Sequence, residues 1–313
     1  MFPEIQPVKA KWGWKIAAAT AALLFGVVAA PQARAEQWTG SCSVSGRPDV
    51  RIKTDDGGVT VTPGSGGQVQ YRVDYTGYTV DKNLHIEARQ NGNTCELAVR
   101  TGHWGINISS GWHKNLHLTV SMPQDADLDV NTGDGGVEVQ RVKGKVSIQT
   151  GDGGVRASDL NGDIYLHSGD GSITAESLAG NIRIHTGDGH IEGRGLDGTV
   201  DADSGDGHIT LEGRFDGLNI KTGDGSVSAK AGTGSKMGGS WNIRTGDGSV
   251  DLTLPGDLQA NIDASTSDGR ISLGLPVTVE GTFSNSQIHG KMNGGGPALT
   301  VHTGDGSIRL SKT

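Results

Sequence analysis

The sequence contains few of the residues that fill a large globular core. Only 4% of its 313 residues are aromatic and 34% are hydrophobic, so bulky side chains cannot fill a wide interior. Proline is also scarce, with 9 residues, and the 52 glycines lack the every-third spacing of collagen. These absences exclude a triple helix and argue against a structureless linker. The composition therefore indicates a thin fold punctuated by glycine.

Positive charge is scarce as well. The formal net charge is −8, and the first 35 residues hold four basic residues against one acidic residue, so the remainder is more acidic than the whole chain. Such a surface is a poor electrostatic match for nucleic acid or for an anionic membrane. We therefore expect no nucleic-acid partner.

The first 35 residues have the plan of a secretory signal peptide. A basic stretch ends at Lys15, an apolar run extends from Ile16 to Ala30, and Ala33-Arg34-Ala35 follows, which predicts cleavage before Glu36. An uncleaved membrane anchor is the alternative, although the run is shorter than the roughly 20 residues of a spanning helix. We expect an exported protein of the periplasm, cell envelope or extracellular surface, with no stable transmembrane domain after cleavage.

The chain has only two cysteines, Cys42 and Cys95. An even number of cysteines in an oxidising compartment is expected to form disulfides. A redox or metal pair is the alternative, but no Cys-x-x-Cys spacing or clustered histidine supports it. The sequence therefore predicts one disulfide between Cys42 and Cys95.

From Asn131 onward the chain repeats a Thr/Ser-Gly-Asp-Gly tetrapeptide. Further copies at Asp247, Asp268 and Asp305 lie outside the regular phase. A short fixed period of this kind is typical of stacked-repeat architectures. The regular aspartates recur at one constant interval, at Asp134, Asp152, Asp170, Asp188, Asp206 and Asp224.

Apolar residues keep fixed places within each repeat. The alternation within each half indicates two short, half-buried strands, and the interruption between the halves indicates a second turn. A β-solenoid of parallel coils and a meander of antiparallel hairpins both provide two strands per unit. Strict columns favour the solenoid, because stacked coils place each column over itself. After Asp134 the apolar positions are Val137, Val139, Val142, Val146 and Ile148.

The sequence therefore predicts an all-β protein, a parallel β-solenoid of 18-residue coils with an N-terminal β-rich cap. Residues 1–35 are the signal peptide, residues 36–130 the cap region and residues 131–313 the solenoid. A cap is expected because the open end of a solenoid exposes strand edges. One predicted outward column is polar, mixed in charge and free of aromatic residues: Glu138, Arg156, Thr174, Glu192 and Thr210.

Several segments resemble a known family. They are Leu116 to Asp125, Leu128 to Gly135, the recurrent Thr-Gly-Asp-Gly-Ser-Val, and the C-terminal Ile288 to Pro297 with Leu299 to Ile308. Together they are similar to the bacterial putative-adhesin domain family, and the resemblance covers most of the mature chain. It implies a β-helical protein that is exported or associated with the cell envelope, and it supplies no active site to transfer.

The stacked aspartates are the first candidate site. Carboxylates about 4.8 Å apart repel one another, so either each accepts backbone hydrogen bonds within its own turn or cations lie between coils. Calcium-binding β-rolls also use Gly/Asp-rich turns, but their Gly-Gly-x-Gly-x-Asp pattern is different. We favour self-capping turns over a Ca²⁺ ladder, and we expect the Thr/Ser column to be a hydroxyl ladder that closes the turn.

Histidines around these turns offer a candidate transition-metal site. Imidazole and carboxylate ligands suit zinc, copper or nickel. Solvated turn residues are the simpler interpretation, which we favour because the sequence shows no group that orients the rings. We therefore predict no required cofactor. The candidate ligands are Asp170, Asp188, Asp206, His185, His190 and His208, with His167 and Asp203 nearby.

One segment of the cap region concentrates aromatic residues. His103, Trp104, Trp112 and His113 lie within eleven residues, and exposed indoles stack on sugars or anchor protein partners. In the alternative that we favour, both tryptophans cover the apolar end of the solenoid.

The sequence has no evident catalytic motif. It lacks a nucleophile elbow, a His-Glu-x-x-His helix and a phosphate loop, and catalysis needs one site with unlike neighbours whereas the aspartates are periodic. We expect a non-enzymatic envelope or surface protein, an adhesin that binds a protein or glycan partner. A structural or envelope-stress-related periplasmic role is the second hypothesis. A carbohydrate-active β-helix enzyme is the third.

Overall fold

The computed structural model describes residues 36–102, 114–279 and 284–313. They belong to one compact unit, Arg34–Thr313. All regular elements in these residues are β-strands, which confirms the predicted all-β class. Correspondingly, the described residues include no helix that could cross a membrane. The predicted signal peptide, residues 1–35, lies outside the described residues.

The chain winds through two faces of paired strands, which we name face A and face B. Face A contains, in order of pairing, β5 (Leu84–Asn91), β6 (Thr94–Thr101), β2 (Asp49–Thr54), β8 (Asp127–Thr132), β10 (Lys143–Thr150), β12 (Asn161–Ser168), β14 (Ala179–Thr186), the second parts of β15 (Ile191–Ser204) and β16 (Ile209–Thr222), β18 (Trp241–Thr245), β24 (Ala298–Thr303), β20 (Ala260–Thr266), β23 (Gln287–Met292) and β22 (Thr278–Val279).

Face B is built in the same way from the alternate strands. It contains β1 (Glu36–Ser43), β4 (Gln68–Thr76), β7 (Asn115–Met122), β3 (Gly58–Pro63), β9 (Val137–Gln140), β11 (Val155–Ser158), β13 (Ile173–Glu176), the first parts of β15 and β16, β17 (Val227–Ala231), β19 (Val250–Leu254), β25 (Ile308–Lys312) and β21 (Ile271–Gly274).

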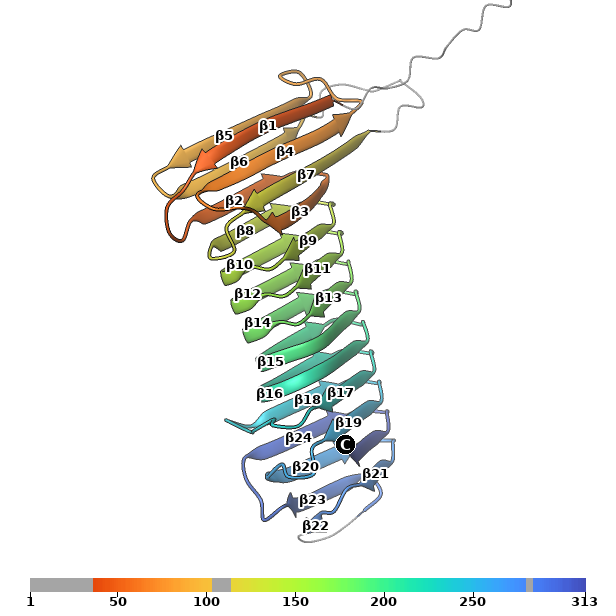
Figure 1. Ribbon diagram of the computed structural model, residues 1–313. Coiled ribbons are helices and arrows are strands. Elements are labelled where there is room, and N and C mark those ends of the chain that lie inside the picture. Colours follow the sequence, from red (N-terminus) through yellow and green to blue (C-terminus); the bar gives the residue numbers. More distant parts are fainter. Residues whose placement is uncertain (1–35, 103–113, 280–283) are drawn as a thin grey trace, which may run out of the picture. The chain divides into compact units, whose positions relative to one another are not determined.

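The repeat produces the predicted parallel stack (Figure 1). From β8 to β15 every strand pairs in parallel with its equivalent in the next repeat, as Val146 does with Ile164 and Ile164 with Ile182. This register confirms the β-solenoid, and it excludes a meander of antiparallel hairpins for these repeats. The outward column from Glu138 to Thr210 also stacks as predicted.

Antiparallel pairing is confined to the two ends of the stack. At the N-terminal end β1, β4 and β7 pair antiparallel on face B, and β5 and β6 do so on face A. Strand pairing is continuous across residue 131, because β8 pairs with both β2 and β10. The division into a cap region and a solenoid at that residue stays a prediction.

The two faces enclose a narrow core of mostly aliphatic side chains. Ala157, Ala175 and Gly193 stack in one inward column, and a Cβ at Gly193 would press into Leu196 and Leu211. This confirms that the interior accepts little volume at that position. Two large aromatic residues, Phe215 and Trp241, are fully buried and meet edge to face at 6.3 Å, where the regular period ends.

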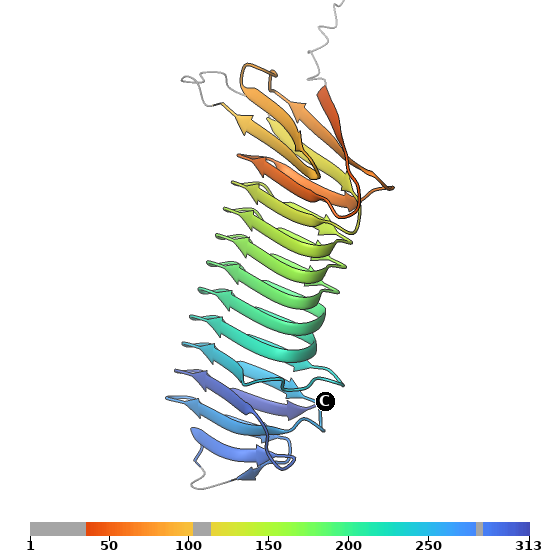
Figure 2. The same ribbon diagram turned by 90° about the vertical axis from the view of Figure 1, so that its left-hand side faces the viewer.

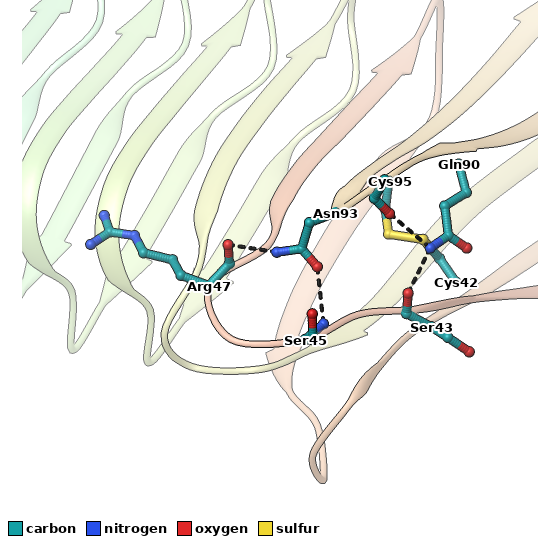
Figure 3. Close-up of a disulfide and its surroundings, with 8 residues drawn as sticks. Cys42, Ser43, Ser45, Arg47, Gln90, Asn93 and Cys95 are labelled. Carbon is teal, nitrogen blue, oxygen red and sulfur yellow. Dashed lines mark hydrogen bonds between the residues drawn. A yellow bond between two sulfur atoms is a disulfide. The ribbon is translucent and has the colours of Figure 1, made fainter.

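The predicted disulfide is confirmed. Cys42 on β1 and Cys95 on β6 are bonded, with their Cα atoms 6.2 Å apart, so the bond joins face B to face A through the core. Beside it, the Asn93 side chain donates to the Arg47 carbonyl at 2.8 Å and accepts from the Ser45 amide at 2.9 Å (Figure 3). The disulfide therefore fixes β1 to the hairpin of β5 and β6, and the two hydrogen bonds of Asn93 fix the segment that follows β1.

The C-terminal end departs from sequential stacking. The last coil, β24 and β25, lies between the coil of β18 and β19 and the coil of β20 and β21 (Figure 1 and Figure 2). The long interval between Asp268 and Asp305 along the sequence contains β22 and β23, which precede the last coil. Spatially, the turn at Asp305 lies between the turns at Asp247 and Asp268.

Successive turns approach so closely that a side chain cannot lie between them. The second glycine of each tetrapeptide lies directly on the preceding turn, and a Cβ at Gly171 would overlap the carbonyl oxygen of Gly153. Because the obstacle is backbone, no rotamer change relieves it. Glycine at this position is a packing requirement of the stack.

We expect Gly171→Ala to lower the free energy of unfolding by about 3 kcal/mol, because overlap with fixed backbone forces the coils apart. Chemical denaturation of the purified protein measures this change. Gly239→Ala is the matched control, since a Cβ there meets nothing within 4 Å, and it should change stability by less than about 0.5 kcal/mol. Equal effects at the two sites would contradict the packing argument.

Candidate functional site

The tetrapeptide turns form one edge of the stack, which we name the turn ridge. A buried hydroxyl precedes each turn, and from Thr150 onward it donates to a carbonyl of the neighbouring turn, whereas Thr132 Oγ1 has no partner among the described atoms. Ser168 Oγ donates to the carbonyl of Gly153 at 2.9 Å and accepts from the amide of Gly171 at 2.9 Å. Two repeats further along the chain, Ser204 makes the equivalent hydrogen bonds, each at 3.0 Å. The predicted hydroxyl ladder is confirmed.

The aspartates of the ridge do not cap their own turns, contrary to our expectation. All of them are exposed, and in the described chain none of their carboxylates accepts a hydrogen bond. Water supplies the compensation instead, because carboxylates about 4.8 Å apart repel by less than about 1 kcal/mol in bulk solvent and salt weakens this further. The ladder of negative charge therefore does not require a ligand, and Ca²⁺ binding there stays a prediction.

We expect Asp188→Asn to raise the free energy of unfolding by less than about 1 kcal/mol at low salt, because it removes like-charge repulsion along the ridge. The gain should vanish at high salt. Thermal unfolding at low and at high salt measures both effects, and the same scans with Ca²⁺ and with a chelator test for bound cations. A variant less stable than the parent protein in Ca²⁺ alone would instead favour cations between the coils.

The structure separates the residues predicted to bind a transition metal. His185 lies on β14 and points outward on face A, whereas His190 and His208 lie on the other side of the ridge. Their rings stack on each other at 5.3 Å. His190 Nδ1 accepts from the amide of His208 at 3.2 Å, and His208 Nδ1 accepts from Ser226 at 2.9 Å. These two rings therefore serve as hydrogen-bond acceptors between coils.

Asp170, Asp188 and Asp206 remain at the exposed tips of the ridge and are not gathered around these rings. Across residues 36–102, 114–279 and 284–313, no group of three or more His, Cys, Asp or Glu side chains is placed to hold a metal ion. His103, Trp104, Trp112 and His113, the predicted binding residues, lie outside the described residues. Their role stays a prediction.

A cluster on face A was not predicted from the sequence. Outward side chains of β12, β14 and β15 stack in two adjacent columns. The Tyr165 and His167 rings lie nearly parallel at 6.3 Å, and the His167 and His185 rings lie at 5.1 Å. We name this cluster the ring patch; it consists of Tyr165, His167, Arg183, His185, Asp201 and Asp203.

The ring patch is open to solvent and carries both signs of charge. Tyr165 is 38% exposed and is the one exposed Tyr, Trp or Phe side chain in the part of the chain that the structure describes. His185 Nδ1 lies 3.9 Å from Asp203 Oδ2, and Asp201 accepts from the Asn219 side chain at 2.6 Å. The signal for this patch was available in the sequence, since its residues lie 13 and 15 positions after an aspartate and alternate with the buried positions 12, 14 and 16.

Burial lowers the pKa of His167, and the neighbouring His185 lowers it further. Its Nδ1 atom is buried and has no hydrogen-bond partner among the described atoms. The neutral ring is therefore the form that the folded protein favours. Protonation would place an uncompensated charge beside a second imidazole.

This shift links stability to pH. The pKa of an unfolded histidine is about 6.5. As the pH drops below that value, the unfolded chain takes up a proton before folded His167 does. The free energy of unfolding therefore decreases as the pH decreases. We expect His167→Gln to reduce the loss of stability between pH 7.5 and 5. Glutamine fits this column, since Gln149 occupies the preceding position.

Denaturation curves at several pH values measure the effect. Gln149→Ala serves as the control, because it changes the same column without removing an ionisable group. An unchanged pH dependence in His167→Gln would contradict the linkage.

A second polar surface lies near the N-terminal end of face B. A shallow hollow of about 560 Å³ opens on the outer side of β1, β4 and β7. Its lining is uncharged except for one arginine, so it offers amide and hydroxyl groups to a polar ligand. The lining includes Gln37, Thr39, Ser41, Gln70, Arg72 and Thr119.

Comparison with known proteins gives one family match. The sequence model of a family described as Toastrack DUF4097 matches residues 48–311. No curated protein matches the chain.

Several solved structures are similar over most of the chain. A "putative lipid binding protein" from Parabacteroides distasonis is 15% identical, with 89% of this chain and 98% of that chain covered and a TM-score of 0.41. A "putative adhesin" from Parabacteroides merdae is 11% identical, with coverage of 88% and 96% and a TM-score of 0.40. A "putative cell adhesion protein" from Clostridium sporogenes is 14% identical, with coverage of 90% and 100% and a TM-score of 0.25. Likeness at this level carries no functional conclusion.

Proposed function

Since the chain belongs to the Toastrack DUF4097 family, we propose that it is a non-enzymatic protein of the cell envelope or surface that binds a macromolecular partner through the ring patch. The family resemblance predicted from the sequence is thereby confirmed. The partner is a protein or a glycan, as the sequence led us to expect. The observation that carries the proposal is the ring patch itself, an exposed Tyr-His-Arg-Asp cluster on an otherwise polar face.

The division of labour within each coil supports this proposal. Inward side chains fill the core, and the backbone and buried hydroxyls hold neighbouring coils together. The outward side chains of the strands and the exposed aspartates of the turn ridge remain for recognition. A surface held by parallel strands is also preorganised, so little conformational entropy is lost when a partner binds.

The composition of the ring patch also suits binding. Tyrosine and arginine are enriched among the residues that dominate binding energy, and an aromatic ring offers an apolar surface with a polar edge. Asp201 and Asp203 add acceptors for hydroxyl or amide donors. The outward column on face B from Glu138 to Thr210 has no aromatic residue, so we place the partner on face A.

Export is supported by two features of the chain. The disulfide between Cys42 and Cys95 is typical of proteins in oxidising compartments. The second feature is the basic, apolar and small-residue plan of residues 1–35, which predicts cleavage before Glu36. We therefore place the mature protein outside the cytoplasm.

The test is binding of residues 36–313 to the isolated envelope fraction, to intact cells and to a glycan array. Tyr165→Ser with His185→Gln replaces the rings by residues that occur in the same columns, Ser147 and Gln149, so the fold should persist. We expect this double variant to weaken binding about thirtyfold, the effect of losing one hot spot of roughly 2 kcal/mol.

The matched control is Arg156→Thr with Glu192→Thr, which changes face B to residues that occur in its own column. It should bind like the parent protein. Equal binding by the ring-patch variant would contradict the proposed site, and a loss confined to Trp104→Ala with Trp112→Ala would move the site to that segment.

A structural role in the envelope is the second candidate. Hydrogen bonds between neighbouring coils hold the stack together without a ligand, which favours this role. The mixed charges of the outward column on face B are also consistent with it. If the parent protein binds none of the three targets, the binding proposal fails and the structural role becomes the better account.

A further inference from the structure

A hollow opens on the outer side of face A, directly beside the ring patch. It measures about 360 Å³ and lies over β2, β8 and β10, and β12 with Tyr165 follows β10 in the stack (Figure 1). The hollow forms because Ser147, a small residue, stands between Asp129 and Tyr165 in one outward column. We name it the face A hollow, and its main lining side chains are Asp49, Arg51, Asp129, Lys145, Ser147 and Gln149.

Four side chains of the face A hollow are available to a ligand. None of them makes a side-chain hydrogen bond with another described residue. They supply a carboxylate, an ammonium group, a hydroxyl and an amide, from Asp129, Lys145, Ser147 and Gln149. All but Lys145 are half-buried, where a hydrogen bond is stronger than in bulk water. Because donors and acceptors are both present, the hollow suits a ligand with several hydroxyl groups, which can donate and accept.

The charges around the face A hollow cancel. Two of its carboxylates are paired with guanidinium groups, Asp49 with Arg51 at 2.7 Å and Asp127 with Arg47. The two remaining charged side chains of the lining have opposite signs. A charged ligand gains little from such a surface, and the acidic chain as a whole repels polyanions. The lining therefore favours a neutral ligand.

The face A hollow lacks the features by which protein partners are usually bound. Among the described residues its lining includes no exposed apolar side chain, since Leu128 is 2% exposed, whereas protein hot spots are anchors seated in desolvated pockets. Both β8 and β10 are paired on their two sides, so neither offers a free edge to an added peptide strand. A ligand rich in hydroxyl groups fits this surface better than a polypeptide does.

The Tyr165 ring connects the face A hollow to the rest of the ring patch. It follows Ser147 in the outward column by one strand spacing, about 4.8 Å, and it is 38% exposed. An aromatic ring offers a flat apolar surface, which matches the C–H face of a sugar. Beyond the ring, Asp201 Oδ1 accepts from the Asn219 side chain at 2.6 Å, which orients the carboxylate and leaves its second oxygen for a hydroxyl. Hydroxyl-binding groups therefore lie on both sides of the ring along the stack.

We propose that face A binds a neutral glycan chain that runs along the stack, with one sugar in the face A hollow and the next against the Tyr165 ring. This inference rests on the proposed function, because it extends the same surface and specifies the partner. From Ser147 to Asp201 the column crosses three strand spacings, about 14 Å. A single sugar ring cannot span that distance, so the ligand is an oligosaccharide or a polysaccharide.

Filling the face A hollow tests this proposal. Ser147→Arg introduces a side chain that occurs in the same column at Arg183, so the fold should persist. The probes are soluble neutral polysaccharides of different linkage, namely mixed-linkage β-glucan, galactomannan, xyloglucan and dextran, with polygalacturonate as the polyanion.

We expect the purified protein to bind at least one neutral polymer in affinity electrophoresis and calorimetry, and Ser147→Arg to weaken that binding about tenfold or more. Binding of a neutral polymer should be the same at low and at high salt, because no charge on the ligand is screened. Polygalacturonate should not bind.

The matched control is Thr300→Arg, which makes a similar change in the same outward column but far from the hollow. It should bind like the parent protein, and denaturation curves establish that both variants fold. The inference is overturned if no neutral polysaccharide binds, or if Ser147→Arg binds as tightly as Thr300→Arg.

A protein partner would give a different pattern. Binding to the envelope fraction would then be lost after protease treatment of that fraction, weakened in the variant Tyr165→Ser with His185→Gln, and unchanged in Ser147→Arg. That result overturns the glycan and leaves the proposed function intact. If the protein binds neither the polysaccharides nor the envelope fraction, intact cells or the glycan array, the inference and the proposed function fail together.

Discussion

Close stacking of backbone on backbone at the turn ridge is the constraint on which the rest of the structure depends. The amide of Gly169 donates to the carbonyl of Gly151, and that of Gly151 to Gly133, each at 2.6 Å. Ladder contacts this close exclude a Cβ, which explains why glycine is abundant. They also fix the spacing of successive coils, and the narrow core between the two faces is filled mostly by aliphatic side chains, so few aromatic residues are needed.

The coil could be predicted from the sequence, but the order of the last coils could not. The recurrence of Val146, Ile164 and Ile182 at one place in successive repeats identifies strands that pair, because only parallel stacking rewards such a column. The same uniformity hides the place of the last coil between two earlier ones. Thr245, Thr266 and Thr303 begin chemically equivalent turns, so local sequence defines what a coil is without defining which coil lies beside it.

The candidate sites were harder to predict because a turn reverses which way neighbours in the sequence face. His185 and His190 bracket one tetrapeptide, yet they belong to opposite sides of the ridge. Conversely, Tyr165 and His185 belong to different repeats and share one patch through the strand register. A periodic fold places related chemistry along columns, so a site must be sought across repeats. Residues close together in one motif, such as His185 and His190, can be separated by the fold.

The uniform coil has a consequence for the length of the molecule. The N-terminal end of the stack is fixed by the disulfide and antiparallel strands, and the other end by the inserted coil. The described strands from β10 to β14 pair only with strands of the regular repeat. Duplicating one 18-residue unit between β10 and β14 would add one strand spacing, about 4.8 Å, and leave both ends intact. The length of the stack can therefore change in steps of one coil while the two ends keep their structure.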